Sequence, residues 1–327
     1  MNRHRILRVL ALAILFAGSL AAPARAAPDF LGAWGAFGVG GGQFRGPGAV
    51  AVSPGGDIYV ADEGNVRIQR FDARGTWLGS LGPGLPDSVR FLSVGGFAID
   101  RLGDVYVADT DNHRVVKLAA DGTFLRTFGS YGTAAGQLRS PTAICVDYLG
   151  RVYVAEQVGR RVQIFTPDGH VTRGWPLQRG EDGIVDPRGM CVGAGGLVYV
   201  ADGYEERVTC YTAEGQVVTA WGRNGLQPGR FWGIGGIAAD PSGSLYVSER
   251  ENSRVQVFSP DGTLLDLFGR PGAGDGEFSS AAGVAIDGAG DVYVSDFGGE
   301  RVEKFGASGV TPASHVSWGS LKARYAR

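Results

Sequence analysis

The chain has 327 residues, of which 55 are glycine and 15 are proline, while 44% are hydrophobic and only 20% are charged. Enough apolar material is present for a large core, so the composition argues against a mainly disordered chain. Glycine is more than twice as frequent as usual and follows no G-X-Y period, which indicates many turns and argues against long helices.

The first 26 residues have the pattern of a secretory signal peptide. Three arginines within the first eight residues precede an apolar run over residues 9 to 22, which is short for a membrane span. A small-x-small cleavage pattern follows at residues 24 to 26. We therefore expect cleavage after Ala26, export to the periplasm or the extracellular space, and no transmembrane segment in the mature chain.

Cleavage would also change the charge balance, because the leader holds four arginines and no acid. The 31 basic residues would fall to 27 against 33 acidic ones, a net charge of −6. Nucleic-acid binding depends on neutralising phosphates, so this sign disfavours a nucleic-acid partner. The basic residues are 28 Arg and 3 Lys. We attribute that skew to coding bias, so the number of arginines alone does not indicate a function.

Six copies of one apolar phrase recur along the rest of the chain. The phrase reads Ile58-Tyr59-Val60-Ala61-Asp62 in the first copy and Val105-Tyr106-Val107-Ala108-Asp109 in the second. Its tyrosines follow one another at intervals of 47, 47, 46, 47 and 47 residues: Tyr59, Tyr106, Tyr153, Tyr199, Tyr246 and Tyr293. A period of this length is typical of a repeat architecture.

Each copy contains four short apolar segments that are separated by turn residues. In the second copy these are residues 96 to 99, 105 to 108, 115 to 118 and 124 to 128. The second segment is apolar on both faces, as expected for a sheet packed between two others. Four strands per unit and six units predict an all-β fold, a six-bladed β-propeller with four-stranded antiparallel blades.

The last copy departs from the pattern at its fourth strand, where Pro312 interrupts a lengthened segment. Residues 29 to 35 near the mature amino terminus instead match residues 123 to 129 of the second copy. We therefore predict that residues 29 to 35 form the outer strand of the last blade and close the ring. The alternative closure uses residues 316 to 319.

The expected organisation has three parts: a signal peptide over residues 1 to 26, a propeller over residues 27 to 319, and a short basic tail over residues 320 to 327. The tail is expected to be flexible, and docking or a role in export remains an alternative.

The repeat resembles a known family. One copy reads Trp221-Gly222-x8-Phe231, then Gly236-Ile237-Ala238, Leu245-Tyr246-Val247 and Asn252-x-Arg254-Val255-Gln256-Val257-Phe258. This copy resembles the NHL repeat, and the resemblance covers about residues 29 to 305 and suggests an exported bacterial type. The resemblance implies the propeller fold. It leaves the activity open, because NHL-type propellers include RNA-binding domains, a zinc-dependent peptidyl-amidating lyase and exported bacterial proteins of unknown role.

Every copy places an acid five residues before an arginine, at the end of the second strand and the start of the third. The six pairs are Asp62 and Arg67, Asp109 and Arg114, Glu156 and Arg161, Asp202 and Arg207, Glu249 and Arg254, and Asp296 and Arg301. A single active site has no use for six equivalent copies. We interpret them as structural pairs across the hairpin, each contributing about 0 to 1 kcal/mol if exposed.

The sequence offers no converging set of metal ligands. The mature chain has His113, His170 and His315, and the first two fall in loops expected on opposite faces. The segment from Asp109 to Asp111 begins like a calcium loop but lacks its glycine and closing glutamate. We therefore expect no cofactor and no metal ligand, and a channel-bound calcium or zinc ion stays an alternative.

Three cysteines are present, so at least one thiol lacks an intramolecular partner. Cys145 and Cys191 occupy a position that is alanine in the other four copies, a small buried slot where a packing thiol is expected. A bridge between Cys145 and Cys191 is the alternative, and Cys210 is the leftover thiol.

Departures from the repeat are the best guide to a ligand site. At the start of the first strand, where the blades surround the channel, five copies have a small residue and the fourth has Arg188. The six residues are Gly48, Gly95, Thr142, Arg188, Gly235 and Ala282. Arg188 could bind an anion or a carboxylate, or it could pair with its neighbour Asp186. Loops on the same face carry further aromatic and arginine candidates, which are Trp232, Tyr204, Arg160, Arg250 and Phe297.

These observations favour a non-catalytic module that binds a protein, peptide or glycan on the face carrying Arg188 and Trp232. A metal-dependent enzyme of the lyase or lactonase type, with its site at the central channel, is the alternative that the resemblance implies.

Overall fold

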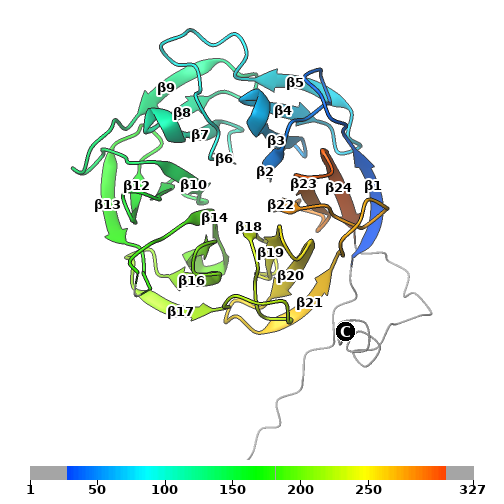
Figure 1. Ribbon diagram of the computed structural model, residues 1–327. Helices are drawn as coiled ribbons and strands as arrows, with labels where there is room; N and C mark the ends of the chain where they lie inside the picture. The colour runs from blue at the N-terminus through cyan, green and yellow to red at the C-terminus, as the bar shows by residue number, and fades with distance from the viewer. Residues whose placement is uncertain (1–27, 181, 307–327) are drawn as a thin grey trace, which may run out of the picture.

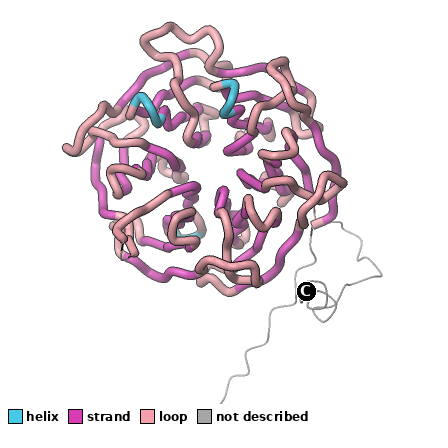
Figure 2. Tube along the Cα trace, in the orientation of Figure 1, coloured by secondary structure: helices cyan, strands magenta, loops and turns pink. Residues whose placement is uncertain are grey.

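Each repeat forms one four-stranded antiparallel sheet, and the six sheets are arranged as blades in a ring (Figure 1). The computed structural model describes residues 28–180 and 182–306. Nearly all of this part is strand or connecting loop, with short 3-10 turns η1 (Glu63–Asn65), η2 (Thr110–Asn112) and η3 (Ala194–Gly196) (Figure 2). The predicted six-bladed all-β propeller is confirmed. The predicted signal peptide and basic tail lie outside the described residues.

The strands of blades 1 to 5 follow one another from the channel outward in chain order (Figure 1). Blade 1 contains β2 (Pro47–Val52), β3 (Ile58–Asp62), β4 (Arg67–Phe71) and β5 (Trp77–Leu81). Blade 2 contains β6 (Gly96–Ile99), β7 (Val105–Asp109), β8 (Arg114–Leu118) and β9 (Phe124–Phe128). Blade 3 contains β10 (Pro141–Val146), β11 (Val152–Glu156), β12 (Arg161–Phe165) and β13 (Val171–Pro176).

Blade 4 contains β14 (Pro187–Val192), β15 (Val198–Asp202), β16 (Arg207–Tyr211) and β17 (Val217–Trp221). Blade 5 contains β18 (Ile234–Ala239), β19 (Leu245–Glu249), β20 (Arg254–Phe258) and β21 (Leu264–Phe268). Blade 6 contains β22 (Ala281–Ile286), β23 (Val292–Asp296), β24 (Arg301–Gly306) and β1 (Asp29–Trp34).

The amino-terminal strand β1 closes the ring as predicted. It pairs antiparallel with β24, so that Asp29 lies opposite Gly306 and Trp34 lies opposite Val302 (Figure 1). This pairing covers the edge of β24 that a linear array would leave open. Residues 316 to 319, the alternative closing segment, lie outside the described residues.

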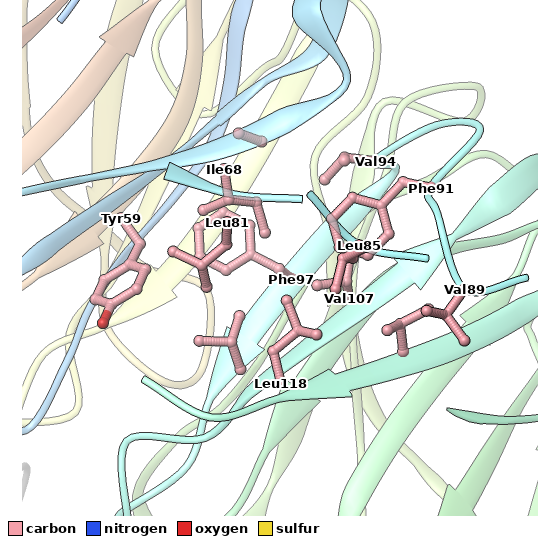
Figure 3. Packing of buried hydrophobic residues seen from close by; sticks show 13 residues of the cluster. Tyr59, Ile68, Leu81, Leu85, Val89, Phe91, Val94, Phe97, Val107 and Leu118 are labelled. Carbon is pink, nitrogen blue, oxygen red and sulfur yellow. The ribbon is translucent and has the colours of Figure 1, made fainter. Parts of the chain in front are cut away.

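Six apolar clusters lie at the six junctions between neighbouring blades, because the second strands are buried on both faces. All five residues of β7 are buried, and the equivalent strands of the other blades are buried in the same way. Figure 3 shows the junction of blades 1 and 2, where residues from both blades meet: Tyr59, Ile68, Leu81, Phe97, Val107 and Leu118. Each blade therefore buries its apolar residues only where it packs against the two neighbouring blades.

The buried repeat tyrosines place their hydroxyl groups near the turn between the first two strands or near the next blade. Tyr106 donates to Asp100 at 3.1 Å, within its own blade. Tyr59 donates to the carbonyl of Ala120 at 3.3 Å, in the neighbouring blade. These bonds satisfy hydroxyls that would otherwise be buried without partners.

The repeated acid and arginine form a buried ion pair, which we call the staple. In blade 5, Arg254 Nε lies 2.6 Å from Glu249 Oε1, and both side chains are almost fully buried. Equivalent contacts of 2.6 to 3.4 Å occur in four more blades: Asp62 and Arg67, Asp109 and Arg114, Glu156 and Arg161, and Asp296 and Arg301. The value of about 0 to 1 kcal/mol for an exposed pair does not apply to these five pairs, because all five acids are completely buried.

The staple also holds the connection that enters each blade. In blade 5, Glu249 accepts the backbone N–H of Trp232 at 3.1 Å, and Arg254 donates to the carbonyls of Leu226 and Arg230. All six acids accept a backbone N–H in this way, at 2.7 to 3.1 Å. The connection can therefore stay irregular without leaving its backbone polar groups unsatisfied.

Blade 4 differs from the other blades at this position. Arg207 donates through Nη2 to the carbonyl of Gln178 at 2.9 Å, while its Nε has no hydrogen-bond partner among the described residues. Asp202 accepts the backbone N–H groups of Asp186, Tyr204 and Glu205 instead. The expected pair across this hairpin is thus replaced by separate contacts to the backbone.

Removing one member of a staple should be costly, since the other charge would remain buried without a partner. We expect Arg254→Ala to lower the free energy of unfolding by about 3 to 5 kcal/mol, measured by urea denaturation. The control is Arg126→Ala, because Arg126 and its partner Asp168 are both exposed and 3.4 Å apart. That change should cost no more than about 1 kcal/mol. Equal losses for the two variants would contradict a special role for the staple.

Glu303 occupies a buried position that is glutamine in three blades, at Gln69, Gln163 and Gln256. Its Oε2 accepts the N–H of Gly276 at 3.1 Å, and its Oε1 lies 2.6 Å from Arg301. Burial raises the pKa of Glu303 to about 7, although Arg301 lowers it.

Because this pKa lies above the ordinary value of 4.5, the folded state holds the proton more tightly than the unfolded state. Stability is therefore lost as the pH rises from the unfolded to the folded pKa. Glu303→Gln should raise the free energy of unfolding relative to wild type. We expect this difference to increase by on the order of 2 kcal/mol between about pH 5 and about pH 8, measured by urea denaturation. The exposed Glu214→Gln is the control, and equal pH dependence of wild type and Glu303→Gln would refute this account.

Candidate functional site

The inner ends of the blades surround a cavity of about 390 Å³ at the mouth of the central channel, which all six blades line. Two repeat positions contribute to its wall. One is the start of the first strand, and the other is the residue directly after the repeated acid. We call this region the channel mouth.

Small residues form much of the wall because the backbones approach one another closely here. A Cβ atom on Gly283 would lie 2.5 Å from the carbonyl oxygen of Gly48 and 2.9 Å from the backbone nitrogen of Val50. The same crowding explains why most copies have glycine or alanine at this level.

Arg188, on the first strand of blade 4, is the larger residue at this position and lines the channel mouth. Its Nε donates to Asp186 Oδ2 at 2.6 Å, so the pairing considered from the sequence is present. The arginine side chain is nevertheless 47% exposed. The contact uses Nε and leaves the Nη groups as donors for a ligand.

Arg250 reaches the channel mouth from blade 5. Its guanidinium carbon lies 4.8 Å from the ring centre of Phe297, and Nη2 lies 4.0 Å from Glu63 Oε1 of blade 1. Its buried Nε has no hydrogen-bond partner among the described residues. Phe297 thus supports an arginine that bridges from blade 5 toward blade 1 across blade 6.

Glu63 and Arg250 are both partly desolvated, which perturbs their titration. Burial raises the pKa of Glu63, while Arg250 and Arg188 oppose that shift. Burial also lowers the pKa of Arg250, with Glu63 opposing and Arg188 adding to the shift. The ion pair between Glu63 and Arg250 is long, so the attraction does not fully compensate the burial of either charge.

Four of the six candidate residues from the sequence, Tyr204, Trp232, Arg160 and Phe297, do not line the channel mouth. Tyr204 is 46% exposed, and its hydroxyl donates to Asp182 Oδ2 at 3.2 Å. Trp232 is equally exposed, and its backbone is bound by the staple of blade 5. Arg160 lines a different groove, beside β13. Arg188 and Arg250 lie together, and Phe297 stands behind Arg250.

Glu63, Thr110 and Gln157 also line the channel mouth and were missed from the sequence. Each directly follows a repeated acid, a position that reads Glu63, Thr110, Gln157, Gly203, Arg250 and Phe297 around the ring. The variation among the six copies at this position is the sequence signal that indicates them. Gln157 also donates to Asp186 Oδ1 at 2.8 Å, so Asp186 holds both Gln157 and Arg188.

The remaining chemical candidates have structural surroundings. His113 Nδ1 accepts the backbone N–H of Ser140 at 3.1 Å, and its ring lies 4.9 Å from Tyr131. Cys145, Cys191 and Cys210 are free thiols; Cys145 and Cys210 are buried, whereas Cys191 is half-buried. Burial raises the pKa of all three.

Within residues 28–180 and 182–306, no three His, Cys, Asp or Glu side chains are grouped as a metal site. These donors do not fit the channel-bound metal that the family resemblance allowed, and we derive no metal chemistry at the channel mouth. The helices of the same part include none long and apolar enough to cross a bilayer.

Comparison with known proteins agrees with this architecture. The family model of the NHL repeat matches residues 44–71, 91–118 and 231–258, which begin in the connection and end at the third strand of blades 1, 2 and 5. The molecule is thus a closed six-bladed β-propeller with a polar cavity at its hub. Three of its six repeats match the NHL repeat.

Solved structures with the same fold include proteins of different activity. A streptogramin B lyase aligns at 15% identity with a TM-score of 0.57, covering 80% of this chain and 93% of that chain. A gluconolactonase from Xanthomonas campestris aligns at 16% identity with a TM-score of 0.60, covering 81% and 86%. A Bacteroides thetaiotaomicron protein of unknown function aligns at 15% identity with a TM-score of 0.66, covering 84% and 73%. No curated protein matches the chain by sequence. Identity at this level shows the fold alone.

The close approach of backbones at the hub gives a direct test. We expect Gly283→Ala to lower the free energy of unfolding by about 1 to 3 kcal/mol, because its Cβ would meet backbone atoms that cannot rotate away. Gly288→Ala is the matched control, since nothing lies within 4 Å of a Cβ there. Urea denaturation measures both, and an unchanged Gly283→Ala would show that the hub is not tightly packed.

Proposed function

We propose that the chain is an exported binding module that takes an anionic group of a protein, peptide or glycan at the channel mouth. The observation that carries the proposal is Arg188, an arginine that replaces a small residue at the hub and is half exposed in a cavity lined by six blades. Repeated residues serve the fold, so a ligand site is sought where the repeat is broken.

The charges of the channel mouth restrict the class of ligand that can bind there. Arg188 and Arg250 are cationic, while Glu63, Asp111 and Asp186 line the same cavity and are acidic. A polyanion would meet repulsion from these carboxylates. The site is better suited to a single carboxylate beside hydroxyl, amide or ammonium groups, which peptides and glycans provide.

Export and partner class rest on the sequence. A basic, then apolar leader supports secretion, and the net charge of −6 after its removal disfavours nucleic acid. The exposed Trp232 and Tyr204 lie on loops outside the cavity and could extend the contact with a larger partner.

Acid–base catalysis at the channel mouth is a second candidate function, and the environment of Glu63 supports it. Its carboxyl has a raised pKa in a cavity and faces two arginines, an environment found at many catalytic sites. Propellers of this fold include a lyase and a gluconolactonase. In this reading Glu63 would transfer a proton, and Arg188 or Arg250 would bind the developing oxyanion.

The test is to screen the mature protein against acidic and neutral peptide and glycan panels and to compare Arg188→Ala with wild type. We expect the affinity for carboxylate-bearing ligands to fall by about tenfold or more. Arg223→Ala, an exposed arginine outside the channel mouth, is the control and should bind as wild type does. Unchanged affinity of Arg188→Ala for every ligand found would refute the site.

Glu63→Gln separates the two candidates. A binding module should show no turnover of lactone or cyclic-ester substrates, whereas an enzyme should lose turnover on this substitution and still bind substrate. Elemental analysis of the purified mature protein completes the test, because stoichiometric zinc or calcium would support the metal-dependent alternative.

A further inference from the structure

A second cavity, of about 690 Å³, lies along β13 at the outer side of blade 3. All six residues of β13 line it, together with residues of the preceding and following loops. Five of the lining residues are arginines and none is acidic: Arg139, Arg160, Arg161, Arg173 and Arg179. We call this cavity the arginine groove.

Composition does not explain this concentration. The chain has 28 arginines among 327 residues, so a set of 13 lining residues would hold about one by chance. The expected mature charge of −6 also has the opposite sign to the groove. A local cluster of like charges raises the energy of the folded state unless counter-charges are close.

Ion pairs with acidic residues neutralise only some of these arginines. Arg161 is neutralised by Glu156 at 2.6 Å, and Arg173 lies 3.7 Å from Glu214 with both side chains at least half exposed. Arg139, Arg160 and Arg179 form no ion pair with an acid among the described residues. The Nε of Arg139 is buried and has no hydrogen-bond partner in the same part of the chain.

One departure from the repeat that creates the groove is at Arg160. This residue has the left-handed backbone that ends each hairpin. At the same position in blades 4 and 6, Glu206 and Glu300 accept the backbone N–H groups of Gly233 and Gly46 in the next blade. A guanidinium has no acceptor atom, so Arg160 cannot make this bond.

The second departure is the connection after β13. It has ten residues, from 177 to 186, whereas the connection after β9 has twelve, from 129 to 140. In that longer connection Tyr131 pairs with Leu138 in an isolated bridge, as do equivalent residues in three other connections. The loop beside β13 is therefore shorter, and it contributes Arg179 to the groove.

We propose that the arginine groove binds an oxyanionic group carried on a larger ligand. This group is either a phosphate or a cluster of carboxylates. Guanidinium groups bind such oxygens through paired N–H donors. The rest of the wall includes Val171, Trp175 and Pro176, and the volume exceeds that of one anion. An apolar or neutral body would lie along β13, with the anionic group between Arg139, Arg160 and Arg179.

The site is independent of the function proposed for the channel mouth. Acidic residues line the channel mouth and disfavour a multiply charged anion there, whereas the arginine groove has only cationic and neutral lining residues. The two sites should therefore select different ligands on one molecule.

The test measures binding of inorganic phosphate, citrate and phenyl phosphate to the mature protein by calorimetry at low ionic strength. Phosphate and citrate distinguish a phosphate group from clustered carboxylates, and phenyl phosphate tests for the apolar body. We expect one of the anions to bind, and phenyl phosphate to bind more tightly than inorganic phosphate if the phosphate group is the one recognised. In the double variant Arg160→Gln with Arg179→Gln, the affinity should fall by about tenfold or more.

Two controls locate the site. Arg223→Gln removes an exposed arginine of the blade 4 connection, and Arg74→Gln removes an exposed arginine from the turn between β4 and β5; neither residue lines the groove. Both should bind the anion as wild type does, and thermal unfolding should confirm that every variant is folded. The proposal is overturned if neither phosphate nor citrate binds, if the double variant binds like wild type, or if Arg223→Gln weakens binding equally.

Discussion

A buried carboxylate at the end of each second strand organises this propeller. An ionised carboxylate cannot be removed from water without partners, so each acid is enclosed by donors. In four blades those donors are an arginine five residues later and a backbone N–H of the incoming connection, as at Glu249, Arg254 and Trp232. In blade 6 Arg301 forms an ion pair with Asp296 at 3.4 Å, and the backbone N–H groups of Ser279 and Ser280 donate to the carboxylate. One cluster of polar bonds thus fixes a hairpin and the loop beside it, and it positions the residues that follow the acid at the hub.

Much of the fold could be predicted because equivalent residues recur in every copy of the repeat, so the same contacts form in every blade. The tyrosine period gave the number of blades, and the apolar faces of the second strands implied burial between neighbours. The match of residues 29 to 35 to an outer strand implied closure, which β1 confirms. Strand ends were placed one residue short in blade 2, since Asp109 and Arg114 pair in register and extend both strands. The burial of the staple was not foreseen, because the loop that covers it comes from about 17 residues earlier.

The candidate sites were only partly visible in the sequence. Arg188 was found because it breaks a position that is otherwise small. Glu63 was missed because polar residues are common in turns, and only closure of the ring places it near Arg250. The arginine groove depends on a loop length and on residues 40 positions apart, Arg139 and Arg179, so no local pattern indicates it. Residues shared by all copies therefore indicate the fold, and residues that differ between copies indicate the candidate ligand sites.

Amide hydrogen exchange is the most direct measurement of whether the staple holds the connections. In Arg254→Ala, we expect the amide of Trp232, which donates to Glu249, to lose protection. The amide of Leu92, which donates to Asp109 in blade 2, should keep its wild-type protection. Unchanged protection at Trp232, or equal loss at both amides, would contradict the view that each staple orders its own loop.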